Sequence, residues 1–189
     1  MIRLEKLNKA QVENVYNERM VIDFPKDELK PLDILYKAMD NGIYEPLGLF
    51  NGTELIGYIF LVKNNHDYLV DYLAVYPQQR NLGSGGVMVR LLPDYLKDAQ
   101  NIIAEIENPE YAENEDDRIL QTRRFGFYTR NGCSDTGLRV RCFGVPFMIL
   151  RWGKKENEDL NALWDLYQSF YRIILPKDMF EKSIEKCDW

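Results

Sequence analysis

An arginine and three glycines lie close together in the segment Leu73–Gly86, whose sequence is LAVYPQQRNLGSGG. The segment begins with an apolar strand pattern that Pro77 stops, and it continues through a turn with glycines at positions 83, 85 and 86 into a helical pattern. Glycines allow a backbone to turn tightly and to bring its N–H groups close to an anion, and a helix N-terminus adds partial positive charge. The turn therefore predicts a binding site for a diphosphate group.

Two common nucleotide-binding motifs do not match this turn. A P-loop needs a Gly-Lys-Ser/Thr ending, and the turn has no lysine. The dinucleotide motif G-x-G-x-x-G needs a third glycine at the position where this sequence has Met88. Both nucleotide-binding classes are therefore disfavoured.

The pattern Arg80-x-x-Gly83-x-Gly85, after a strand that ends in Val-x-Pro, resembles the acetyl-CoA motif of the GNAT superfamily of N-acyltransferases. The resemblance spans about residues 1–152 and implies acetyl-CoA as the acyl donor. It also implies that the strand backbone pairs with the pantetheine arm and that the amides of the turn wrap the diphosphate. The strand residues are Leu73, Ala74 and Val75, and the turn residues are Arg80, Asn81, Leu82, Gly83, Ser84, Gly85 and Gly86. The alternative is a strand-to-helix turn that needs glycine only for its geometry.

Acyl transfer to an amine needs a base for the ammonium proton, a donor to the thioester carbonyl and an acid for the leaving thiolate. The segment that contains Tyr128 resembles the late helix of the GNAT family, whose tyrosine lies beside the CoA sulfur and donates its proton. The resemblance thus makes Tyr128 the candidate acid, and the alternative is a packed aromatic residue. Many relatives have an asparagine that binds the pantetheine about two turns earlier, where this sequence has Gln121.

Two glutamates are candidate bases. Strand alternation puts Glu105 and Glu107 on one face, about 7 Å apart, where like charge and partial burial would both raise a carboxyl pKa. Asp71, on the preceding strand, is a third candidate. The alternatives are exposed or ion-paired carboxylates, or a water relay without a dedicated base.

The remaining composition excludes several classes of protein. The chain has one histidine, His66, and three widely spaced cysteines, so neither a metal site nor a disulfide framework nor a Cys-His nucleophile is expected. The net charge of −6 disfavours a nucleic-acid binder. No run approaches the ~20 apolar residues of a membrane span, which predicts a cytoplasmic protein that does not bind membranes.

Hydrophobic periodicity predicts an α/β chain of the α+β type with a mixed, mostly antiparallel sheet, and the resemblance implies a GNAT-like sheet flanked by helices. The expected order is βααβββαβαββ, followed by a helical extension. The predicted strands cover residues 2–6, 46–51, 55–62, 67–76, 101–107, 137–142 and 145–152. The predicted helices cover residues 8–20, 29–40, 84–99 and 118–130. In the extension, residues 160–171 show helical spacing, and a last short helix runs from 176 through 187. Pro93 predicts a kink or an early end in its helix.

The chain is thus expected to form an acyltransferase domain over residues 1–152 and a helical extension over 153–189 that packs on it. The predicted function is N-acetyl transfer from acetyl-CoA to a primary amine of a small molecule or peptide, by direct attack in a ternary complex. One alternative is a non-catalytic acyl-CoA-binding module. Another is an interaction protein that binds a partner or a second copy through residues 156–189, so a homodimer remains open.

Overall fold

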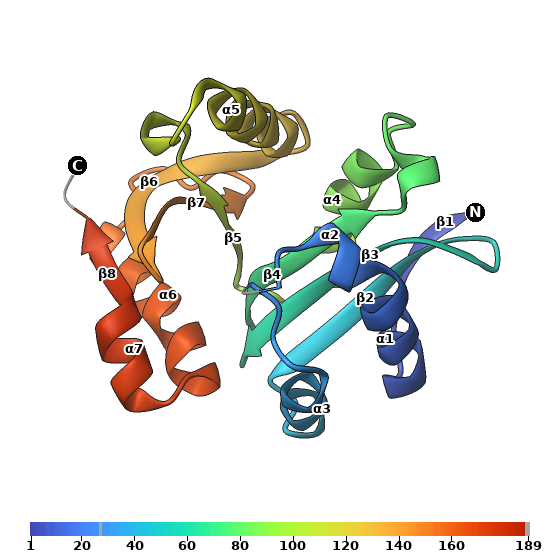
Figure 1. Cartoon of the computed structure of the whole chain (residues 1–189). Coiled ribbons are helices and arrows are strands. Elements are labelled where there is room, and N and C mark those ends of the chain that lie inside the picture. Colours follow the sequence, from blue (N-terminus) through green and yellow to red (C-terminus); the bar gives the residue numbers. More distant parts are fainter. Residues whose placement is uncertain (27, 188–189) are drawn as a thin grey trace. The chain divides into compact units, whose positions relative to one another are not determined.

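The computed structural model describes residues 1–26 and 28–187. Its internal contacts divide the chain into two compact units. The first unit comprises residues 1–65 and 70–97, and the second comprises residues 66–69 together with those from 98 onward. In Figure 1 the colours from blue to green mark most of the first unit, and those from yellow to red mark most of the second.

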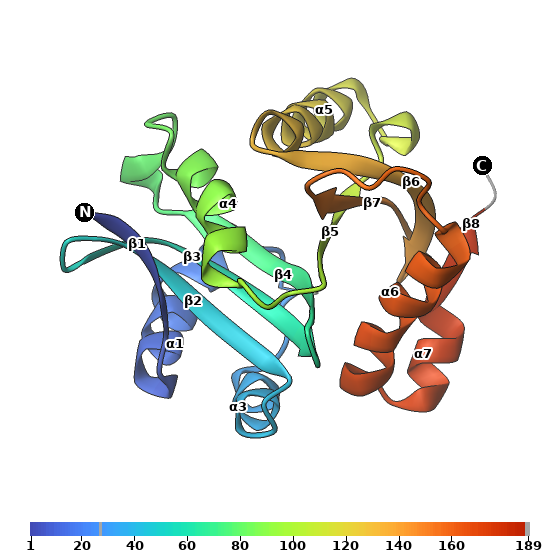
Figure 2. The same cartoon turned by 180° about the vertical axis from the view of Figure 1, so that it is seen from behind.

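The first unit is built on antiparallel strands with helices on both faces. β1 (Ile2–Lys6), β2 (Tyr44–Asn51) and β3 (Glu54–Asn64) pair in sequence, and β4 (Asp67–Val75) follows β3 in the sheet. In both cartoons the N-terminal helices cover one face of these strands and α4 covers the other (Figures 1 and 2). These helices are α1 (Lys9–Val15), α2 (Val21–Asp23), α3 (Leu32–Asp40) and α4 (Ser84–Tyr95).

The second unit pairs the later strands with the C-terminal helices. β5 (Asn101–Glu107) is antiparallel to β7 (Val145–Trp152), which is antiparallel to β6 (Cys133–Cys142). β6 also pairs with β8 (Ile184–Cys187). The helices of this unit are α5 (Glu115–Arg130), α6 (Leu160–Ile174) and α7 (Lys177–Ser183).

The predicted fold class is confirmed. Among the described residues, eight strands form a mixed, mostly antiparallel sheet in the order β1-β2-β3-β4-β5-β7-β6-β8. A capping box begins α1: the Asn8 side chain accepts from the backbone amide of Gln11, and the Gln11 side chain accepts from the backbone amide of Asn8. The early end at Pro93 is also present, since α4 stops at Tyr95 rather than at residue 99.

Several bounds differ from the sequence prediction: β6 begins at Cys133 and not at 137, and α3 begins at Leu32 and not at 29. Three further differences concern the type or the end of a helix. The first helical segment contains a π-helical turn, Tyr16–Met20, between α1 and α2. α5 begins at residue 115, because Asn114 caps it by accepting from the Asp117 amide. The last predicted helix is wrong at its end, because residues 184–187 form the strand β8. This strand pairs with the edge of β6, and a segment of four residues is too short for its hydrophobic pattern to predict that pairing.

The predicted domain boundary after residue 152 stays a prediction. Within the extension, α6, α7 and β8 all belong to the second compact unit. Residues 188–189 of the extension lie outside the described part of the chain.

Candidate functional site

The glycine turn joins β4 to α4 in the first unit. A short 3-10 turn, Pro77–Gln79, follows the strand, and α4 begins at Ser84. Asn81 and Gly83 have positive φ angles of 64° and 85°. A Cβ at Gly83 would meet no atom within 4 Å, so glycine is required here by the backbone conformation and not by close packing.

The amides of this turn divide into two groups. Those of Arg80 and Leu82 donate to carbonyl oxygens within the turn, at 3.2 and 3.4 Å. In the part of the chain that the structure describes, the other amides of the turn have no backbone acceptor; they belong to Asn81, Gly83, Ser84, Gly85 and Gly86. Unpaired amides at the start of a helix form an anion-binding site, which is the chemistry that the sequence predicts.

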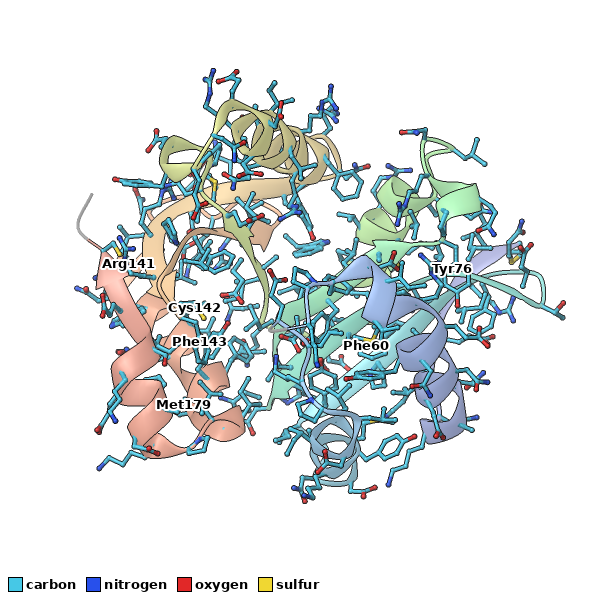
Figure 3. All side chains as sticks on the ribbon, in the orientation of Figure 1. Phe60, Tyr76, Arg141, Cys142, Phe143 and Met179 are labelled. Carbon is cyan, nitrogen blue, oxygen red and sulfur yellow. The ribbon has the colours of Figure 1, made fainter. Side chains whose placement is uncertain are left out.

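The Arg80 side chain is held by Asp23, the last residue of α2. Asp23 Oδ1 accepts from Arg80 Nη2 at 2.9 Å and from Arg19 Nη2 at 2.6 Å, and its Oδ2 accepts from the Tyr58 hydroxyl at 2.9 Å. The Asp23 side chain is only 4% exposed. The Arg19 guanidinium lies 5.5 Å from the ring centre of Tyr76, one of the residues labelled in Figure 3. Asp23 thereby ties the turn to the N-terminal helices.

Sequence reasoning missed this cluster. Arg19 and Asp23 have the i,i+4 spacing of a helical ion pair, which was a usable signal. The link from Asp23 to Arg80 spans 57 positions and joins α2 to the turn that follows β4. No local pattern encodes such a contact.

Asp71, a predicted base, has charged and polar partners in the first unit. Lys30 Nζ donates to both of its carboxylate oxygens, at 2.7 and 2.9 Å. The Tyr44 hydroxyl also donates to Asp71. The carboxylate is therefore ion-paired, as one of the sequence alternatives anticipated.

Tyr128 lies in the last turns of α5 in the second unit, and its side chain is buried. Its ring packs edge-on against Phe127 and Trp152, with centroid distances of 5.2 and 6.0 Å. Burial, and then the neighbouring Cys133, raise the pKa of Tyr128, while Arg124 opposes the shift. No hydrogen bond joins its hydroxyl to another described residue, so the phenol proton is available to a ligand.

Gln121 is also buried, and its Oε1 atom has no hydrogen-bond partner among the residues described. A buried polar atom without a partner costs free energy unless a water or a ligand satisfies it. The Gln121 side chain is thus chemically able to accept a hydrogen bond from an amide, as the asparagine of the resemblance would.

The two predicted glutamates of β5 have different partners. Glu105 accepts from the hydroxyls of Tyr167 at 2.6 Å and Tyr171 at 2.5 Å, both on α6. Glu107 forms an ion pair with Arg124 of α5 and is partly exposed. Each of the two carboxylates is therefore engaged by side chains of the same unit.

The structure adds three findings on cysteine, metal ligands and membranes. Burial raises the pKa of the Cys133 thiol to about 12, which makes it a poor nucleophile. Within residues 1–26 and 28–187, no three His, Cys, Asp or Glu side chains cluster in a way that could hold a metal ion. None of the helices described is both long and apolar enough to span a membrane.

No protein-family model and no curated protein matches the sequence. Solved structures do match the fold. A protein from Bacteroides thetaiotaomicron, described as a GNAT-family acetyltransferase, superposes with a TM-score of 0.72 at 22% identity, over 91% of this chain and 97% of that chain. A Bacillus subtilis acetyltransferase in complex with CoA superposes with a TM-score of 0.57 at 17% identity, over 82% and 100% of the two chains.

A third match extends the range of relatives in fold. The spermidine N-acetyltransferase of Vibrio cholerae superposes with a TM-score of 0.56 at 14% identity, over 79% of this chain and 92% of that chain. The three structures share the fold of this chain over most of its length. The chain has the fold of the GNAT acetyltransferases.

Proposed function

We propose that this protein is an acetyl-CoA-dependent N-acetyltransferase that acts on a primary amine of a small molecule or peptide. The observation that carries the proposal is the row of unpaired amides between Asn81 and Gly86, in a chain with the GNAT fold. These amides fit a diphosphate, and a neighbour in fold was crystallised with CoA. Acetyl-CoA supplies the thioester when it is bound, and the chain supplies the groups that hold it and move protons.

Binding of the donor is assigned to the first unit. The turn amides hold the diphosphate, and the backbone of Leu73–Val75 pairs with the pantetheine arm, as the family resemblance implies. Arg80 adds a positive charge to the turn, and its side chain is kept in place by Asp23. Gln121 belongs to the second unit, and its role as acceptor for a pantetheine amide rests on the family resemblance and on its unsatisfied Oε1.

Proton donation to the leaving sulfur is assigned to Tyr128. Its raised pKa keeps the phenol protonated at neutral pH, which is the state an acid needs. The absence of a protein partner for its hydroxyl, among the described residues, leaves the proton free for this step. Since the Cys133 thiol is a poor nucleophile, the amine attacks the thioester directly and no acyl-cysteine is formed.

Proton removal from the acceptor is assigned to Asp71. Glu105 is bound by two tyrosine hydroxyls and Glu107 by Arg124, and an acceptor amine resembles neither of these partners. The cationic partner of Asp71 is a primary ammonium, the same chemical group as the acceptor. An acceptor that takes the place of Lys30 would therefore meet a carboxylate able to remove its proton.

The test is CoA release from acetyl-CoA with a panel of amines that includes a polyamine, an amino acid and a peptide with a free N-terminus. The polyamine is included because a spermidine N-acetyltransferase shares the fold. Turnover with at least one amine is expected, and Tyr128→Phe should lower kcat by about 10²- to 10⁴-fold while the Kd for CoA is unchanged. The matched control is Tyr36→Phe on α3, which should keep full activity.

Two results would redirect the proposal. Tight CoA binding without turnover of any amine would make the chain a non-catalytic acyl-CoA-binding module. A Tyr128→Phe variant with the wild-type rate would remove Tyr128 from the mechanism and leave the donor site in place.

A further inference from the structure

Lys30 is seated in the first unit as a bound alkylammonium would be. Its Nζ donates to both oxygens of Asp71 and lies 5.2 Å from the ring centre of Tyr72. The Tyr44 hydroxyl donates to the same carboxylate, which is 9% exposed. A buried carboxylate beside an aromatic face is a strong combination for binding a primary ammonium.

The walls of this site are rigid, because the sheet supplies them. Asp71 and Tyr72 lie on β4 and Tyr44 lies on β2. The Tyr72 ring packs edge-on against Phe24 and Phe60, at centroid distances of 4.9 and 6.4 Å, and Phe60 is labelled in Figure 3. The Tyr72 hydroxyl donates to the Glu28 carbonyl at 2.6 Å, which fixes the plane of the ring.

The occupant is easier to move than the walls. Lys30 lies outside regular secondary structure, just before α3, and 24% of its side chain is exposed. Its ammonium sits at the end of a flexible four-carbon stem. Exchange of one ammonium for another keeps Asp71 paired, so the buried carboxylate need not become uncompensated.

We propose that Asp71, Tyr44 and Tyr72 form an ammonium site that Lys30 fills in the free protein and that the primary alkylammonium of the acceptor takes by displacing Lys30. The identification of the incoming group as the acceptor rests on the proposed function. The site favours primary ammonium groups, since the group that fills it in the free protein is one. Lys30 thereby competes with the substrate and sets a threshold for the amine concentration.

The test replaces the built-in ammonium by one in solution. Lys30→Ala should bind n-butylammonium, and calorimetry and thermal shift should give an affinity at least about 10-fold tighter than that of the wild-type protein. n-Butanol, which has a similar length and no charge, should not bind. The double variant Lys30→Ala/Asp71→Asn should lose the binding. Should Lys30→Ala not fold alone, Lys30→Gln keeps a neutral donor to Asp71 and is measured in the same way.

The chain offers a matched control at Lys9. Its Nζ pairs with Asp40 and lies 5.4 Å from the ring centre of Tyr36, but the Lys9 side chain is 47% exposed. Lys9→Ala should therefore not create a binding site for n-butylammonium, because water screens the exposed pair. Equal affinities in the wild type, Lys9→Ala and the Lys30 variants would overturn the inference.

The binding measurement needs neither CoA nor turnover, so two failures can be told apart. Butylammonium binding to Lys30→Ala without acetylation of any amine would sustain the ammonium site and refute the proposed function. Acetylation of an amine, with no ammonium binding in any Lys30 variant, would sustain the function and refute this site. In an active enzyme, Lys30→Ala should also lower the KM for a primary alkylamine several-fold.

Discussion

At the level of single residues, Gly83 separates backbone conformation from packing. Its φ of 85° disfavours any residue with a Cβ, although the space beside it is open. Gly83→Ala should therefore lower the free energy of unfolding by about 1 kcal/mol, and it should weaken CoA binding because the turn amides shift. Denaturant unfolding and calorimetry measure the two effects.

The control for this change is Gly42→Ala, at the end of α3, where φ is 70° and the Cβ position is also open. It should cost a similar free energy of unfolding without changing the Kd for CoA. An unchanged CoA affinity in both variants would argue that the turn only connects β4 to α4.

Asp23 gives a second prediction at this level. Asp23→Asn removes the charge that holds Arg19 and Arg80, and it should cost about 2 kcal/mol of stability. The affinity for CoA should fall several-fold, because Arg80 is no longer fixed beside the turn. Asp135→Asn, which breaks the ion pair with Arg139 in the second unit, should reduce stability and leave CoA affinity unchanged. Equal CoA affinities in the two variants would contradict a positioning role for Asp23.

At the level of elements, the sequence predicted those helix and strand ends that nearby residues determine. β5 and β7 match their predicted bounds, because Asn108-Pro109 follows the end of one strand and Gly144 forms the turn just before the other. The cap of α1 and the early end of α4 are likewise local. β8 and the π-helical turn were missed, since β8 exists only through its pairing with β6, and nothing in residues 16–20 distinguishes π from α geometry.

In the candidate site, too, the sequence predicted local motifs but not contacts between distant segments. The glycine turn and Tyr128 were predicted because both are short motifs that resemble those of a known family. The carboxylates were recognised, but their partners were not: Lys30 lies 41 positions from Asp71, and Tyr167 lies 62 positions from Glu105. These contacts depend on how the helices pack on the strands, which single-chain periodicity does not encode.

The junction of α6 with β5 supports a prediction about stability. Glu105→Ala leaves two buried tyrosine hydroxyls without their acceptor and should cost about 2–5 kcal/mol in denaturant unfolding. Glu107→Ala removes a partly exposed pair with Arg124 on the same strand and should cost less than about 1 kcal/mol. Similar losses in the two variants would show that Glu105 does not anchor α6.

Across the whole molecule, buried tyrosines bind interior carboxylates. Tyr58 donates to Asp23, Tyr44 to Asp71, and Tyr167 with Tyr171 to Glu105. Each unit thus keeps acidic side chains below its surface by giving them phenol partners. The arrangement links the many tyrosines of this acidic chain to its stability at high pH.

Burial is the main cause of a raised pKa for six of the buried tyrosines: Tyr44, Tyr58, Tyr72, Tyr128, Tyr167 and Tyr171. For Tyr72 the pKa is raised to about 12. In the unfolded chain these groups ionise near the ordinary tyrosine pKa of about 10. Their contribution to stability is therefore complete below about pH 10 and is lost as the pH rises toward the folded-state pKa values.

The free energy of unfolding should accordingly be insensitive to these tyrosines up to about pH 9. It should then fall by about 1.4 kcal/mol per pH unit for each of them. Denaturant unfolding at a series of pH values gives the slope of the free energy of unfolding against pH. Tyr171→Phe should reduce this slope by the contribution of one tyrosine, about 1.4 kcal/mol per pH unit. Tyrosinate absorbance should rise in two steps, of which the second coincides with the loss of far-ultraviolet circular dichroism. Ionisation of every tyrosine while the circular dichroism remains native would contradict the burial of these phenols, because a charged phenolate cannot stay beside Asp71 or Glu105 without water.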